Sequence, residues 1–431
     1  MIKKILQSSL FKASGIYTLA NIINSAIPFF LLPILTVYLS PTDYGIVSMF
    51  GVLLGFFAPF LGLNMHGAVN RKYFDENKNF SLYLSTSFYI LIASTSLILL
   101  IIILFSDFIS QLTSFPEKWL FLIVLGGFGN SIIQITLTLW QVRGRAVNYG
   151  LFQILQTVLN LVLTLIFVIS LDLGWIGRVN AQVFAIIAFS IIGLIIVIRR
   201  ENLTFGWDKE YTRDILKFGV PLIPHALGAF LITMTDRIFI TNMVGISETG
   251  VYTVGYQIGL VISILQDSFN KAWMPYLYAK LNLKSIVVNK KIVAFTYGYF
   301  VVILLITLLL GAISPFIVDI FIGKSFEGAT QYIIWIALGF AFNGMYKMVS
   351  GVIYYEKKTH FLSTVTFLTA LLNLVFNYFL IKLNGAVGAA QATALAFFVS
   401  FILTWILANK VHPMPWNLLK KNVNEKNQSN E

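Results

Sequence analysis

The 431-residue chain contains no cysteine. Disulfide bonds and thiolate metal ligands are therefore excluded, although this absence does not identify a cellular compartment. Charged residues are also scarce, at 11% of the chain, whereas apolar residues make up 58%. Because about a quarter of the residues of a soluble domain are charged, this composition excludes an ordinary soluble protein.

Long apolar runs occupy most of the chain, and each is roughly 20–28 residues long, which is enough to cross a bilayer. A basic head precedes the first run, which is too long for the core of a signal peptide, so we expect a retained helix. The sequence predicts an all-α integral membrane protein with about 12 transmembrane helices. The expected spans are 13–39, 44–66, 80–105, 118–141, 149–170, 176–198, 216–242, 249–275, 289–313, 328–354, 361–382 and 385–408.

Positive charge is concentrated in alternate gaps between these spans. Most of the 30 Lys and Arg residues lie on the side that holds both chain ends, which predicts cytoplasmic N- and C-termini. The net charge of +12 is thus explained by topology and by contact with anionic membrane lipid, so we expect no nucleic-acid partner. Four cations lie on the opposite side, and two lie within spans: Lys118, Arg178, Lys324 and Lys382, then Arg237 and Lys347.

The longest polar interruption runs from Arg199 to Asp214 and divides the spans into two sets of six. We expect an N-terminal six-helix bundle over 1–199, a cytoplasmic linker over 200–213 and a C-terminal six-helix bundle over 214–410. The polar stretch 411–431 is expected to be a cytoplasmic tail.

The two halves resemble copies of each other. Asp43 and Gly45 match Glu248 and Gly250 at an offset of 205, and LNLV recurs at 159 and 372. LGWIGRVNAQVFA from 173 aligns with NGAVGAAQATALA from 384. Six helices per copy give both copies the same orientation, which predicts parallel repeats around a central cavity. The alternative is that small residues recur because tight helix packing uses them.

Lys347 lies within the tenth expected span, where a central Lys is unfavourable by roughly 2.5–3.5 kcal/mol. Facing a cavity would relieve that cost and offer a cation to an anionic substrate. The alternative is a Lys that reaches toward the membrane surface or packs against Asn343, one turn away.

Asp236 and Arg237 are neighbours in the seventh span. Side chains of neighbours on a helix point about 100° apart, so the two need not pair. Arg237 could bind phosphate oxygens, and Asp236 could hold it or act in coupling or gating. A structural ion pair is the alternative.

Asp267 and Lys271 are four residues apart in the eighth span, so the spacing favours a structural pair on one helix face, with gating or substrate binding as the alternative. His225 lies beside Pro224, and Pro221 precedes both. The two prolines predict a bend in this helix, and His225 is a candidate substrate-binding residue or a buried structural His. GGFGN from 126 lies inside an apolar span and indicates packing, and no metal or nucleophile motif is present.

SPTDYGI from 40 and TDRIFITNMVGISETGVYTVGYQIG from 235 resemble the polysaccharide-export branch of the multidrug/oligosaccharidyl-lipid/polysaccharide exporter superfamily. Within it, the chain looks most like the O-antigen and capsule repeat-unit flippases. The residues that match the family's motif are Asp236, Arg237, Gly250 and Tyr252. It implies flipping of undecaprenyl-pyrophosphate-linked oligosaccharide by alternating access, through a cationic cavity in the bacterial cytoplasmic (inner) membrane. It also implies no cofactor apart from a coupling ion, H⁺ or Na⁺, and partners such as a polysaccharide polymerase and chain-length machinery.

Two other classes stay open at this point. An H⁺- or Na⁺-coupled multidrug or metabolite antiporter would use Asp236 or Asp267, but no Asp or Glu lies well inside a first-half span. A membrane glycosyltransferase or polymerase generally needs a sizeable outer loop with acid and base residues, which the chain lacks. We therefore expect a flippase rather than an enzyme.

Overall fold

The computed structural model describes residues 23–24, 27, 29–75, 79–201, 203–204 and 206–417, and these form helices and their connections without a β-strand. The chain forms two compact units, Met1–Thr253 with Phe321–Glu327 (unit 1) and Val254–Ile320 with Gly328–Glu431 (unit 2). The expected bundle boundary at 200–213 stays a prediction. The start of the first expected span and the tail beyond 417 lie outside the described residues.

Helices that are long and apolar enough to span a membrane make up most of the described chain. There are nine of them there, and a bent pair, Lys209–Gly228 with Phe230–Met243, makes a tenth. The short apolar helix Phe29–Tyr38 and the 36-residue α12 (Ile246–Leu281) occupy the two other expected positions. The all-α membrane fold in two repeats is confirmed. The nine are α3 (Pro41–Gly62), α5 (Phe80–Leu104), η1–α7 (Glu117–Val142), α8–η2 (Ala146–Ser170), α9 (Gly174–Glu201), α13 (Ile286–Phe321), η4–α14 (Lys324–Tyr355), α15 (His360–Asn384) and α16 (Ala386–Val411).

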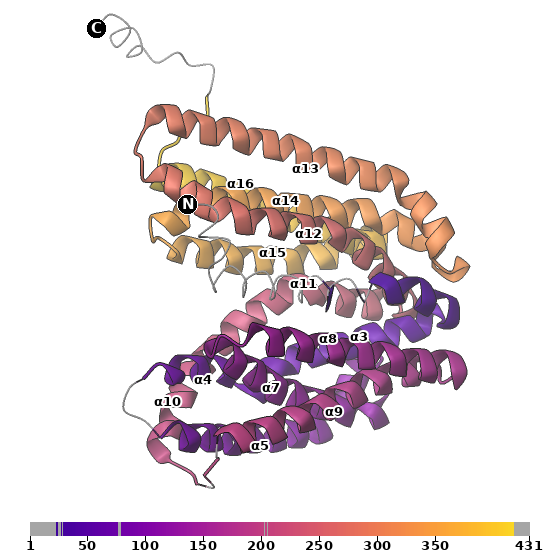
Figure 1. Cartoon of the computed structure of the whole chain (residues 1–431). Coiled ribbons are helices and arrows are strands. Elements are labelled where there is room, and N and C mark those ends of the chain that lie inside the picture. Colours follow the sequence, from indigo (N-terminus) through magenta and orange to yellow (C-terminus); the bar gives the residue numbers. More distant parts are fainter. Residues whose placement is uncertain are drawn as a thin grey trace, which may run out of the picture. The chain divides into compact units, whose positions relative to one another are not determined.

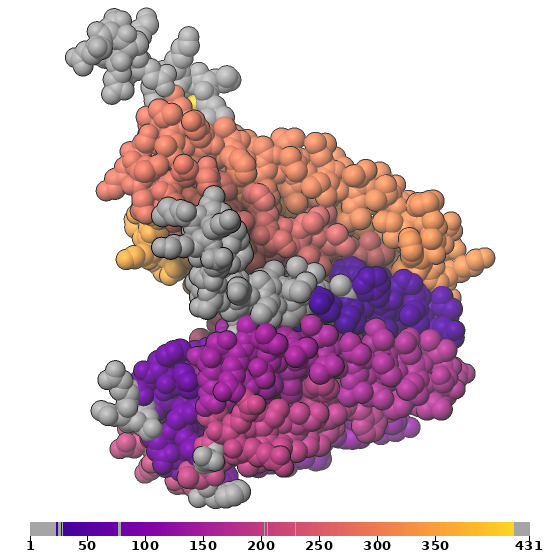
Figure 2. All heavy atoms as spheres, viewed as in Figure 1, coloured from indigo at the N-terminus to yellow at the C-terminus, as the bar shows by residue number. Residues whose placement is uncertain are grey.

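In unit 1, α7 packs between α3 and α9, and α8 packs on α9 (Figure 1). Buried apolar side chains of α3, α7 and α9, such as Phe50, Ile123 and Val183, form the core of this unit. In unit 2, α16 packs against both α14 and α15. The space-filling view shows α13 along an outer face of unit 2, where its apolar side chains Val301, Leu305 and Leu309 are exposed (Figure 2). Such a face suits contact with lipid.

The first turn of α3 is fixed by local sequence. Ser40 caps the helix, because its hydroxyl accepts from the Asp43 amide at 3.1 Å while the Asp43 carboxylate accepts from the Ser40 amide at 3.1 Å. Pro41 occupies the first helical position, where a missing N–H costs nothing. The SPTD sequence is therefore a capping box that sets where α3 begins.

The starts of α3 and α12 cross closely within unit 1. A Cβ on Gly250 would lie 2.0 Å from the carbonyl oxygen of Pro41, and a Cβ on Gly45 would lie 2.1 Å from that of Ile246. The hydroxyls of Ser48 and Thr253 are 2.8 Å apart. Each residue of α3 in this contact has its own repeat counterpart in α12, 205 positions later. Gly45 meets the Ile246 carbonyl, and its counterpart Gly250 meets the Pro41 carbonyl, so the contact is reciprocal. Reciprocity of this kind is the mark of two-fold symmetry, and it confirms the internal repeat.

Two short helices close one end of unit 1. On α4 (Met65–Tyr73), Arg71 donates to the Asp214 carboxylate of α10 (Lys209–Gly219) at 2.6 Å. Tyr83 of α5 donates to the same carboxylate at 3.0 Å. The hydrogen bond between Arg71 and Asp214 raises the pKa of the Arg71 guanidinium. The Lys72 ammonium lies 4.9 Å from the centre of the Tyr211 ring, a cation–π contact that also joins α4 to α10.

The seventh span is bent, but not at the expected residues. A short 3₁₀ turn, Val220–Leu222, contains Pro221, and α11 (Ile223–Met243) starts directly after it. The bend of 50° falls between Gly228 and Phe230, about one turn beyond Pro224. Pro224 occupies the start of α11, where its ring is tolerated, so the placement of the bend at the prolines is wrong.

Candidate functional site in the membrane helices

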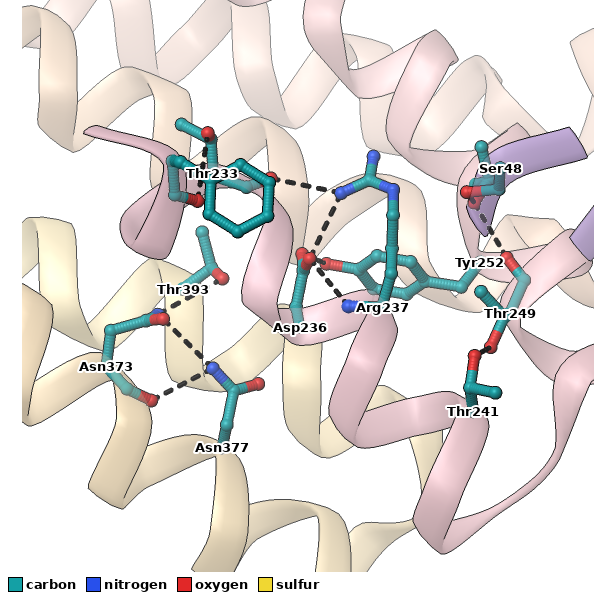
Figure 3. Close-up of polar contacts among 12 residues, drawn as sticks. Ser48, Thr233, Asp236, Arg237, Thr241, Thr249, Tyr252, Asn373, Asn377 and Thr393 are labelled. Atoms are coloured by element: carbon teal, nitrogen blue, oxygen red, sulfur yellow. Dashed lines mark hydrogen bonds and ion pairs between the residues drawn. The ribbon is translucent and has the colours of Figure 1, made fainter. Parts of the chain in front are cut away.

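The charged motif of α11 forms a hydrogen-bonded network in unit 1 (Figure 3). Arg237 donates to the Asp236 carboxylate at 3.0 Å and to the Thr233 carbonyl at 3.0 Å. The hydroxyl of Tyr252, on α12, donates to the other oxygen of the same carboxylate. Asp236, Arg237 and Tyr252 are all buried, and the Arg237 guanidinium also lies 5.8 Å from the centre of the Tyr252 ring.

This geometry shows how two neighbours on a helix pair although their Cβ atoms diverge. The long Arg237 side chain folds back along α11 to reach both Asp236 and the preceding turn. Tyr252 then ties α11 to α12 through the same carboxylate. A buried charge needs a partner and hydrogen bonds, and each member of this group supplies them to the others.

A second ion pair lies in unit 2. The Lys347 ammonium of α14 donates to the Asp267 carboxylate of α12. Their side chains are 26% and 49% exposed, respectively, so this pair is far more open than the one at Asp236. Asp267 therefore pairs with Lys347, and the expected pairing with Lys271 in the same helix is wrong. Lys271 and His225, the other candidate binding residues, are both exposed.

Polar and aromatic side chains surround the second ion pair within unit 2. Gln266, beside Asp267, donates to Asn343, one turn before Lys347, at 3.2 Å. Phe269 of α12 stacks on Tyr299 of α13, with ring centres 4.8 Å apart. Asn343 is thus hydrogen-bonded to α12, while the Lys347 ammonium is bound to Asp267.

Repeat-related positions hold two further polar groups. In unit 1, Arg178 donates to Asn160 at 3.1 Å. In unit 2, the counterpart of Asn160 is Asn373, which is fully buried and accepts from Asn377 at 3.0 Å (Figure 3). Asn373 also donates to Thr393 at 3.5 Å. From the sequence, Asn160 and Asn373 were used only as markers of the repeat. An Asn at matching positions of two apolar spans could have indicated that both form polar contacts between helices.

No group of three or more His, Cys, Asp or Glu residues that could hold a metal ion occurs in the described part of the chain. The polar groups of the spans are isolated pairs and small networks joined by hydrogen bonds. They can hold or exchange a charged or hydroxylated ligand.

Fold and polar groups together define a polytopic α-helical membrane protein of two repeats with charged pairs inside its helices. The family model for polysaccharide biosynthesis proteins matches residues 10–280, and the chain belongs to this family. An uncharacterized membrane protein of Haemophilus influenzae is 27% identical over 386 residues, covering 85% of this chain and 91% of the relative. An Lsg locus protein of the same organism is 26% identical over 405 residues, covering 90% of this chain and 98% of the relative.

Two solved structures share the fold. An inward-facing multidrug resistance MATE family transporter of the MOP superfamily has a TM-score of 0.71 at 16% identity, covering 91% of this chain and 94% of the other. The lipid II flippase MurJ, in an inward closed conformation, has a TM-score of 0.72 at 14% identity, covering 91% and 87%. One of these structures is a transporter and the other is a flippase.

Proposed function

We propose that the chain is a flippase that carries a lipid-linked oligosaccharide across the cytoplasmic membrane for surface polysaccharide synthesis. Its substrate is an undecaprenyl-pyrophosphate-linked repeat unit of the O-antigen or capsule type. Membership of the polysaccharide biosynthesis protein family supports this class of substrate. A polymerase and chain-length machinery would then use the flipped product.

The observation that carries the proposal is the Lys347–Asp267 pair. A Lys facing lipid in the middle of a span is unfavourable by roughly 2.5–3.5 kcal/mol, so this partly exposed cation belongs beside water. Its counter-ion Asp267 is itself about half exposed, at 49%, and can leave without being stranded in an apolar environment. A pyrophosphate, with more negative charge than one carboxylate, can then take its place on Lys347.

In the proposed cycle, Lys347 receives the headgroup when Asp267 releases it, and Asp267 takes Lys347 back when the headgroup leaves. Lys271 and His225, both exposed, would offer further contacts outside this pair. Arg237 is held by Asp236 and Tyr252 in this conformation, and a role in binding would require that network to open. An H⁺ or Na⁺ gradient would drive the cycle through Asp267 or Asp236.

The test is transfer of a labelled polyprenyl-pyrophosphate oligosaccharide between the leaflets of liposomes. Lys347→Ala should slow transfer about 10-fold or more, because one charge-assisted bond to the headgroup is lost. Lys347→Arg should retain more transfer than Lys347→Ala, since it keeps the cation. The double variant Lys347→Ala/Asp267→Asn also removes the unpaired carboxylate. If Asp267→Asn alone still transfers the lipid, continued loss of transfer in the double variant would assign the effect to the missing cation.

Normal transfer by Lys347→Ala would exclude the proposed role of Lys347. If the folded wild type transfers none of several lipid-linked sugars, the flippase assignment is itself wrong. Efflux of small compounds that depends on an H⁺ or Na⁺ gradient would then support the antiporter.

A further inference from the structure

We propose that a polar pocket in unit 1 binds the saccharide part of the transported lipid. The pocket has a volume of about 440 Å³, and its polar lining residues are Asn64, His66, Asn130, Ser131 and Gln134. This inference rests on the proposed function and deepens it, because it assigns the sugar to a site whose described lining residues include no Asp, Glu, Lys or Arg.

The hollow exists because small residues line it. Gly55, Ala58 and Gly62 of α3, Gly127 of α7 and Ala226 of α11 all line it. A volume of this size falls within the roughly 300–1,000 Å³ range of ligand pockets. The space is therefore large enough for a small ligand or for one part of a larger one.

The polar groups of α7 are available to a ligand. Asn130 and Gln134 are one helical turn apart near the middle of the span Glu117–Val142. Within the part of the chain that the structure describes, their side chains hydrogen-bond to no other residue. A polar group facing lipid without a partner is costly, so the two amides belong to a face that meets water or a hydrated ligand.

The α3 side adds backbone groups to the same pocket. Pro59 lacks an N–H, so it cannot donate to the carbonyl of Gly55, one turn earlier, which lines the pocket. Leu63 and Asn64, which end α3, both have positive φ, at 44° and 50°. Such strain persists where surrounding contacts hold it, and here Asn64 donates to the Gly219 carbonyl at 3.4 Å.

The chemistry of this lining matches hydroxyl groups rather than phosphate. An amide and a neutral imidazole each supply both a donor and an acceptor, and a sugar hydroxyl requires both. Among the described lining residues there is no Lys or Arg, the cations that phosphate recognition usually uses. The neighbouring pocket lined by Leu97, Ile98 and Phe60 shows the contrast, because most of its lining is apolar.

The experiment measures binding of two probes to the full chain in lipid nanodiscs: a polyprenyl pyrophosphate bearing an oligosaccharide, and the same lipid without sugar. Asn130→Ala and Gln134→Ala should each weaken binding of the sugar-bearing probe by about 3- to 10-fold, as expected for one lost hydrogen bond. Binding of the sugar-free probe should stay within about two-fold of wild type, less than the effect of one such bond.

Ala58→Leu fills the hollow from α3 and should produce the same selective loss. Leu125→Ala, at an exposed position of α7 outside the pocket, is the matched control and should change neither affinity. Thermal unfolding identifies any variant that does not fold, and the remaining variants then decide the result.

Equal loss for both probes, or no loss for either, would overturn the saccharide site. A wild type that binds both probes with the same affinity would also overturn it, while leaving the flippase function intact. A wild type that binds neither probe would instead count against the proposed function.

Discussion

At the scale of single residues, the two ion pairs differ in how they are held. Asp236 is 2% exposed and satisfied by Arg237 and Tyr252, whereas the Asp267 side chain is 49% exposed. A fully buried pair is costly to break, because the remaining charge is stranded. The Asp236 network therefore suits a structural role in this conformation, and the Lys347 pair suits exchange with a ligand.

Asp236→Asn should destabilise the protein by about 3–5 kcal/mol, because it removes the carboxylate that is paired with the buried Arg237 charge. Tyr252→Phe should cost about 1.5–3 kcal/mol, the value of a hydrogen bond to a charged group. Both can be measured by unfolding in detergent. The exposed Tyr378→Phe should change stability by less than about 0.5 kcal/mol.

The exposed pair Arg71–Asp214 gives a second comparison, because Arg71→Gln should cost no more than about 1 kcal/mol. If Asp236→Asn is as mild as Arg71→Gln, the network at Asp236 is not a structural element of unit 1. A wild-type unfolding curve for Tyr252→Phe would contradict the bond between α11 and α12.

Sequence reasoning identified the charged residues of the site but not their pairing. Lys347 and Arg237 are conspicuous because cations are expensive within spans. The partner of Asp267 is Lys347, 80 positions away on another helix, whereas helix periodicity offered only Lys271 on the same helix. Asn130 and Gln134 were missed, because the GGFGN motif was interpreted as packing. That interpretation holds for Gly127, whose Cβ would lie 2.2 Å from a Leu61 side-chain atom.

At the scale of helices, the length of the apolar runs predicted the spans well. The prolines were a poorer guide to where a helix ends. α5 was expected over 80–105 and runs from Phe80 to Leu104. α12 was expected to end at 275, at a proline, but continues through Pro275 to Leu281. A proline removes one hydrogen bond, and packing of the helix decides whether the helix stops or continues. Such tertiary contacts cannot be inferred from an apolar run.

The crossing of α3 and α12 depends on the two repeat-related glycines. Gly250→Ala should destabilise unit 1 by about 1–3 kcal/mol, because the added Cβ would meet the Pro41 carbonyl at 2.0 Å. Gly45→Ala should destabilise unit 1 by a similar amount, because its added Cβ would meet the Ile246 carbonyl at 2.1 Å. Unfolding in detergent provides the measurement.

Gly51→Ala, about three turns after the start of α3, is the matched control, since its added Cβ would meet no atom of the described residues within 4 Å. It should leave stability unchanged or raise it by up to about 1 kcal/mol, the helix propensity difference. Equal effects of Gly250→Ala and Gly51→Ala would show that the crossing is looser than the structure indicates.

At the scale of the whole molecule, the proposed transport of a lipid-linked sugar would require the chain to expose its site to each side in turn. The positive-inside distribution predicts that the starts of α3 and α12 lie at the outer face. The reciprocal crossing there is held by backbone contact at Gly45 and Gly250 and by the Ser48–Thr253 hydrogen bond. We infer that this crossing is closed here and separates when the outer side opens.

The absence of cysteine makes this inference directly testable. Ser48→Cys and Thr253→Cys together place two thiols where hydroxyls now lie 2.8 Å apart, within reach of a disulfide or a short thiol cross-linker. Linking them should reduce lipid transfer in liposomes at least about 10-fold, because a crossing held shut by a covalent bond cannot separate. Reduction should restore transfer, and each single variant treated with oxidant should transfer normally. Transfer at the full rate by the linked protein would mean that the crossing is a fixed hinge, about which the repeats move without parting.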